Sequence, residues 1–406
     1  MAWSAFFIIF PGYFAYHAMV DAGYIPPLLG GYSTGIAALV LPVMFPAYLM
    51  QAIRHVRLTP VIDLLFFLFI AYFMLVVLIH VDAGANVSVT GPHVAIAVQF
   101  LAIFTTVSLL DVSAPRFRAG SVLAFIALTS VVVARVSAES LIGIALDVPF
   151  VDPDRADYQG YAFVYLVMTL FCAALLRPAW SRLLVYGAAT PALFLNGARS
   201  EFVGFLLVVL LIEWCFARKR SVLLPAMAIC VTIGALSLGS LAAAFPDNRV
   251  LSLVDYGLSD GSIADRREWL GNALLTLGNS PVLGEYASYS TGQYAHNLLS
   301  AWVDLGLFGF LLFSTLLLLP LADLVSQFNR RSREPEYVLT LSVLVVSVVL
   351  LVTAKNFTYQ MLPVALGLYS RDCLRRAYSR QSHTRLRFWR PVTHPAVARA
   401  ASEGGT

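Results

Sequence analysis

The sequence has 406 residues, of which 59% are hydrophobic and only 12% are charged, with a formal net charge of +4. Soluble domains carry roughly 25% charged residues, so this composition excludes a soluble globular protein. The four cysteines form no CxxC pair and show no metal-ligand spacing, so we predict neither a disulfide framework nor a metal site. The basic residues are spread in small groups, which is not the charge pattern of a nucleic-acid-binding protein.

Long unbroken apolar runs indicate an all-α polytopic membrane protein, because a spanning helix needs ~20 mostly apolar residues whereas barrel strands are shorter and alternating. No charged region precedes the first run, so we expect it to be a retained helix. The twelve apolar segments are roughly 3–20, 35–53, 60–80, 92–110, 119–135, 159–176, 179–196, 200–217, 221–243, 296–320, 337–354 and 357–370.

The spans place residues 1–370 in the membrane domain and leave 371–406 as a basic tail. The widest gap, about 245–295, lies between spans nine and ten and is rich in Asp, Gly and Pro, which favour loops. Alternate connections and the tail together carry 20 of the 27 basic residues, which predicts that both termini are cytoplasmic and that the 245–295 loop faces outward. The other seven are Arg135, Arg155, Arg199, Arg249, Arg266, Arg267 and Lys355.

The predicted outer face brings three arginines, Arg199, Arg266 and Arg267, to the same side as His296. Arginine binds phosphate oxygens in a bidentate manner. A histidine at a helix N-terminus is expected to have a lowered pKa and therefore to be a neutral general base. These residues predict a site that holds an anionic leaving group while the histidine accepts a proton from a hydroxyl. Two structural alternatives stay open: Glu201 as the partner of Arg199, and a capping or buried role for His296.

Four aromatic residues lie in or beside the same loop, where their rings suit either sugars or the membrane interface. They are Trp269, Tyr286, Tyr289 and Tyr294. The sequence has no DxD-like acidic pair, no HExxH and no Walker-type glycine loop, so nothing in it supports a metal, nucleotide-sugar or ATP site. We expect Gly306 and Gly309 to share one helix face and to permit close helix packing.

The segment from His296 to Leu299, followed by the segment from Asp304 to Gly309, resembles the signature of the O-antigen ligase and bacterial polysaccharide polymerase superfamily. Three weaker segments are similar to other motifs of that family. They are Ser262 to Arg266, Asn279 to Gly284 and Asn196 to Glu201. The sequence departs from the pattern at Asp304, where glutamate is commoner, and in Gly197-Ala198-Arg199, where Ser-Arg forms are frequent.

The resemblance implies a metal-independent, GT-C-like glycosyltransferase of the bacterial inner membrane that needs no cofactor. Such enzymes transfer a glycan from undecaprenyl pyrophosphate to a hydroxyl of lipid A-core or of another glycan, at the periplasmic face. Carried over by motif, Arg199 and Arg266, with Arg267 as a weaker candidate, would bind the pyrophosphate, and His296 would activate the acceptor. The supporting residues would be Asn297, Asp304, Tyr286 and Tyr294.

Two other classes of function remain open at this point. One is a secondary transporter, and the other is a non-catalytic membrane scaffold of an envelope-assembly complex. Within the transferase hypothesis, a ligase and a polymerase need the same phosphate-binding and base residues, so the sequence does not separate them.

Overall fold

The computed structural model describes the chain except for residues 22, 27–31, 55–58, 83–86, 139–157, most of 218–260, 291 and 389–406. The described part is 84% helical and contains no strand, which confirms the all-α fold. Its N-terminal helices are α1 (Ala2–Ile9), α2 (Pro11–Asp21), α3 (Tyr32–Arg54), α4 (Val61–Asp82), α5 (Val87–Ser108) and α6 (Pro115–Ala138). Its later helices are α8 (Tyr158–Leu175), α9 (Ala179–Asn196), α10 (Arg199–Phe216), α13 (Gly261–Asn279), α14 (Leu299–Arg331), α15 (Pro335–Thr353) and α16 (Met361–Phe388).

Seven helical segments of the described chain are long and apolar enough to cross a membrane: α1 with α2, α3, α4, α5, α6, α14 and α15. Helices α8, α9, α10 and α16 are shorter, less apolar or more charged. The expected span at 221–243 lies mostly outside the described residues, as do Arg155 and Arg249. A multi-pass membrane protein is therefore shown, while the count of twelve spans stays a prediction.

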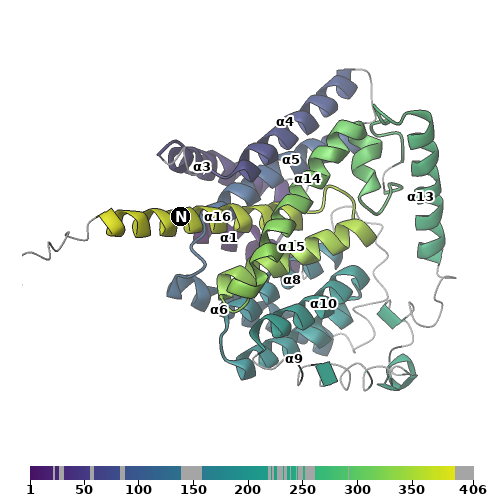
Figure 1. Cartoon of the computed structure of the whole chain (residues 1–406). Helices are drawn as coiled ribbons and strands as arrows, with labels where there is room; N and C mark the ends of the chain where they lie inside the picture. Colours follow the sequence, from purple (N-terminus) through teal and green to yellow (C-terminus); the bar gives the residue numbers. More distant parts are fainter. Residues whose placement is uncertain are drawn as a thin grey trace, which may run out of the picture.

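The helices form one bundle with α5 and α15 near its centre (Figure 1). Helix α5 packs against α3 and α16, and α15 packs against α8, α10 and α16. Phenylalanine rings fill the spaces between neighbouring helices. An example is the stacked pair of Phe66 on α4 and Phe104 on α5, with 4.2 Å between ring centroids. Because lipid is as apolar as these rings, close van der Waals packing holds the helices together.

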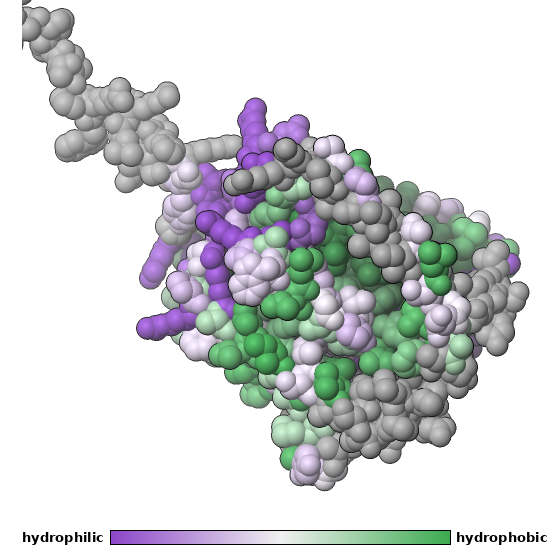
Figure 2. Space-filling model, turned by 90° about the horizontal axis from the view of Figure 1, so that it is seen from below, coloured by the Kyte–Doolittle hydropathy of each residue, from purple (hydrophilic) through white to green (hydrophobic). Residues whose placement is uncertain are grey.

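The two ends of the bundle differ in character. The N-terminus and the far end of α16 lie toward the left in Figure 1, whereas α13 crosses the right-hand end, beside the start of α14. Figure 2 shows hydrophilic residues gathered toward the left of the face seen from below, with hydrophobic residues over its middle. Helix α13 shows that part of the expected 245–295 loop is helical. This helix lies at the end of the bundle opposite the hydrophilic end.

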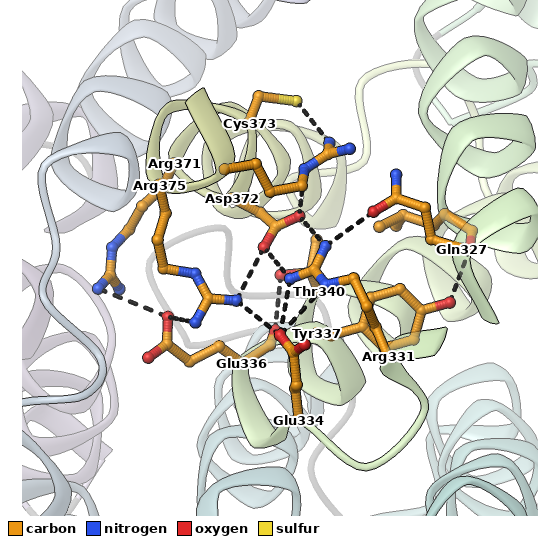
Figure 3. Close-up of polar contacts among 12 residues, drawn as sticks. Gln327, Arg331, Glu334, Glu336, Tyr337, Thr340, Arg371, Asp372, Cys373 and Arg375 are labelled. Carbon is orange, nitrogen blue, oxygen red and sulfur yellow. Dashed lines mark hydrogen bonds and ion pairs between the residues drawn. The ribbon is translucent and has the colours of Figure 1, made fainter. Parts of the chain in front are cut away.

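Basic and acidic side chains at the hydrophilic end tie α14, α15 and α16 together (Figure 3). Arg331 bonds to Asp372 at 2.6 Å and to Glu334 at 3.0 Å, and Arg375 bonds to the same two carboxylates. Side-chain exposure is only 11% at Arg331 and 3% at Asp372. These basic residues come from the group expected on the cytoplasmic side, and they hold the ends of three helices in register.

Replacing Asp372 with Ala should markedly lower the unfolding temperature of the detergent-solubilised protein. Removing one partner of a buried pair costs about 3–5 kcal/mol, because the charge of Arg331 stays buried without its main counterion. The matched control is Arg330→Ala, since Arg330 is the exposed neighbour on the same helix and its loss should cost less than about 0.5 kcal/mol. Equal unfolding temperatures for the two variants would contradict this role of the network.

Candidate functional site at the end of the bundle near α13

Helix α14 is interrupted at Gly306, whose φ of 66° and ψ of −176° are not helical. The backbone groups that the break releases are bonded by the segment just after α13. The carbonyl of Val303 accepts from the N–H of Glu285 at 2.8 Å, and the N–H of Leu307 donates to the carbonyl of Val282 at 2.9 Å. The 281–287 segment therefore docks into the break, which satisfies polar groups that would otherwise be buried unpaired.

Glycine is required at both sides of this contact. A Cβ at Gly306 would lie 2.5 Å from the carbonyl oxygen of Val282. A Cβ at Gly284 would collide with the carbonyl oxygen of Val303. Both glycines also have positive φ, which other residues adopt only with strain. The expectation that Gly306 serves helix packing was wrong, because it opens the helix to a loop. Gly309 does pack closely, with its Cβ position 3.0 Å from the ring of Tyr72 on α4.

Asp304 lies two residues before the break in α14 and anchors the next part of the loop. Its buried carboxylate accepts from the backbone N–H of Ala287 at 3.1 Å and from the hydroxyl of Tyr289 at 2.6 Å. Tyr286, directly before Ala287 in sequence, has its hydroxyl 2.9 Å from Nδ1 of His93 on α5. These bonds fix the segment that leads into His296.

The ring of His296 lies against Trp269 of α13 and Tyr294, with centroid distances of 5.3 Å and 4.6 Å. Burial, followed by the positive charges of Arg266 and Lys355, lowers the pKa of His296 to about 4. The imidazole is therefore neutral at pH 7. The direction agrees with the sequence-based expectation, but the cause differs, because burial and two nearby cations act on a ring that precedes the first residue of α14.

Lys355, in the connection between α15 and α16, is the main residue that sequence analysis missed at this site. Its ammonium lies 2.7 Å from the carboxylate of Glu201, which is completely buried in the first turn of α10, and it donates to Gln159 at 2.9 Å. A signal was present, because Lys355 is one of only two lysines in the chain and stands between two apolar segments.

The other candidate residues take different positions around this centre. Arg199 is the first residue of α10, two positions before Glu201. On α13, Arg266 is half-buried and close enough to act on His296, whereas Arg267 is exposed. Asn297 has a structural role, because its side-chain oxygen accepts from the N–H of Leu299 at 2.9 Å in the turn that leads into α14.

A second set of hydrogen bonds joins the start of α14 to the connection between α15 and α16, which carries Lys355. Ser300 donates through its hydroxyl to the carbonyl of Asn297 at 2.8 Å, and that hydroxyl accepts from the N–H of Phe357 at 3.0 Å. Phe357 lies two residues after Lys355, so these bonds fix the position of Lys355 relative to the first turn of α14.

A cavity of about 250 Å³ opens beside this centre. Tyr294, Lys355 and Glu201 line it, and the rest of its wall comes from residues 356 and 358–360 of the α15–α16 connection and from α1, α2, α3, α5 and α8. Among the described residues no group of three His, Cys, Asp or Glu side chains is placed to hold a metal ion.

No protein-family model matches the sequence, and comparison with the curated proteins finds no match. The structure therefore defines the class on its own: an all-α, multi-pass membrane protein. A neutral histidine, two nearby cations and a cavity lie together at one end of its bundle.

Replacing Gly306 with Ala should detach the 281–287 segment, because the new Cβ would meet the carbonyl of Val282 and the residue would keep a strained positive φ. We expect faster protease cleavage between residues 280 and 298 in the membrane-embedded protein. Gly271→Ala is the matched control, since this α13 glycine has no atom within 4 Å of its Cβ position and alanine favours a helix. Cleavage at the wild-type rate in the Gly306 variant would show that the docked segment does not depend on the break.

Proposed function

We propose that this protein is a metal-independent membrane glycosyltransferase of the O-antigen ligase or polysaccharide polymerase type. It takes a glycan from a polyprenyl pyrophosphate and transfers it to an acceptor hydroxyl at the outer face of the bacterial inner membrane, with both termini in the cytoplasm. The acceptor is lipid A-core or another glycan. The observation that supports this most is the neutral imidazole of His296 beside the positive charges of Arg266 and Lys355.

The proposed reaction follows from these groups. The imidazole of His296 takes the proton of the acceptor hydroxyl, and the resulting oxygen forms a bond to the anomeric carbon of the donor. The bond between that carbon and the pyrophosphate oxygen breaks, and the polyprenyl pyrophosphate leaves with the electron pair. Arg266 and Arg199 stabilise the negative charge of this leaving group, which is where preorganised cations contribute most to the rate.

A transporter is the second candidate, and one observation favours it. Lys355 and Glu201 form a buried ion pair beside a cavity, and ionisable groups inside membrane proteins often mark a transport pathway. Proteoliposomes separate the two functions. Transfer of a radiolabelled glycan to acceptor without solute flux supports the transferase, whereas flux of a small solute without transfer supports the transporter. A scaffold would show neither activity in the purified protein.

Replacing His296 with Ala should reduce glycan transfer by about 10²–10⁴-fold, because that is the usual contribution of a general base. The measurement uses purified protein with lipid-linked glycan and acceptor. The variant should be present in the membrane at the same level as the wild type. Arg266→Gln should act mainly on the KM for the donor, and more strongly than Arg267→Gln, since Arg267 is exposed. Full transfer by the His296 variant would remove the proposed base.

The pH dependence of transfer should reflect the lowered pKa of His296. Because the imidazole becomes protonated only near pH 4, kcat/KM should hold at pH 5–6 and fall as the pH approaches 4. Arg266→Gln removes a positive charge that lowers this pKa, so the acidic limb should move to higher pH. The role of His296 as the base would be contradicted if kcat/KM of the wild type fell near pH 6.5. It would also be contradicted if Arg266→Gln did not shift the acidic limb of the profile.

Gel analysis of surface glycans after deletion of the gene distinguishes the two transferase types. Accumulation of unligated lipid-linked polymer indicates a ligase, and accumulation of single repeat units indicates a polymerase.

A further inference from the structure

We propose that the cavity beside His296 is a binding subsite for an uncharged glycosyl unit, one of the sugars of the donor or of the acceptor. This inference rests on the proposed function for its biological meaning, but the binding itself is a separate property. It is drawn from the charge, the polar groups and the aromatic rings of the cavity wall.

The charge of the cavity favours a neutral ligand. Lys355 and Glu201 are the charged residues among the described ones that line it, and they neutralise each other across 2.7 Å. A charged ligand in this space would have to displace one partner of that buried pair, which is costly. The positive charge that suits a pyrophosphate is that of Arg266, which acts on His296 and is not part of the cavity wall.

The polar groups of the wall do not suit a hydrocarbon chain. Gln99, Asn356, Thr358 and Gln360 all line the cavity, and an apolar occupant would leave their free donors and acceptors without water or partners. Apolar side chains such as Ile9, Ile36 and Phe163 line the cavity too, but a lipid tail would bury these polar groups along with them. An uncharged ligand that is rich in hydroxyl groups pairs with these side chains.

Side-chain carboxamides are well suited to sugar hydroxyls because each offers donors and an acceptor together. Here they are held in place before any ligand arrives. Gln360 donates to the oxygen of Gln99, and Gln99 donates to the hydroxyl of Thr34 at 2.9 Å. Asn356 accepts from the hydroxyl of Thr358 at 3.0 Å. Preorganised side chains lose little entropy on binding, which raises affinity.

Tyrosine rings supply the remaining part of a sugar site. Tyr13, Tyr32, Tyr294 and Tyr359 line the same cavity, and such rings pair an apolar face with a polar tip. Tyr294 also lies against the ring of His296, with centroids 4.6 Å apart. A glycosyl unit in the cavity is therefore next to the proposed base, and its binding determines which glycan the enzyme uses.

Saturation-transfer NMR on the purified, detergent-solubilised protein tests this subsite directly. The probes are methyl glycosides of glucose, galactose, mannose, rhamnose and N-acetylglucosamine, with an alkyl sulfate and a long-chain alcohol as charged and apolar comparisons. We expect saturation transfer to at least one glycoside. The signal should fall at least several-fold in Gln360→Leu and should be unchanged in Gln51→Leu, which makes the same change beside a different, smaller cavity. Thr358→Val serves as a second, milder variant if the leucine variant does not fold.

The outcomes separate the subsite from the transferase proposal. Absence of signal from every glycoside, or equal signals in wild type and both cavity variants, overturns the subsite even if transfer is observed. Glycoside binding retained in His296→Ala, which loses transfer, supports both proposals. If the protein binds a glycoside but never transfers a glycan, the subsite stands and the transferase proposal fails. In the transfer assay, a raised KM for acceptor or for donor in Thr358→Val shows which of the two supplies the bound sugar.

Discussion

The interruption of α14 is the constraint on which the rest of the site depends. A continuous helix at Gly306 would bond Val303 to Leu307 internally and leave no place for the 281–287 segment. With the helix open, the loop replaces that one helical hydrogen bond with two of its own, so the break leaves neither of these groups unpaired. The segment from Val282 to Tyr289, which leads toward His296, is positioned by that exchange and by the carboxylate of Asp304 two residues before the break.

The buried pair of Lys355 and Glu201 sets the second half of the arrangement. Its partners come from the α15–α16 connection and from the first turn of α10, so the pair fixes two parts of the chain that are far apart in sequence. A carboxylate in the first turn of a helix is favoured by the helix dipole, which supports burial of Glu201 at that place. The pair also lines the cavity and adds no net charge to it, whereas Arg266 is not part of the cavity wall.

Composition and run length were sufficient to predict the fold class, because 59% hydrophobic residues allow only a membrane protein. The site was predicted less completely. His296, Tyr294 and Arg266 meet as expected, since they follow one another around a single loop and helix. Lys355 was missed because its role depends on a partner 154 residues away (355 against 201), and no local pattern records that contact. Gly306 was misinterpreted because two glycines spaced for one helix face look the same in sequence whether the helix continues or breaks.

The two cations near His296 couple binding to chemistry in a way that neither group provides alone. Each positive charge makes the protonated imidazole less stable, so in the empty site the ring is a poor proton acceptor. An anionic pyrophosphate beside Arg266 would offset that charge and raise the affinity of the ring for a proton. The base would then become stronger when the donor is bound, which is when an acceptor proton must be removed. If the proposed transferase function holds, this arrangement would restrain the histidine until the donor binds, which is a role for the two basic residues that act on it.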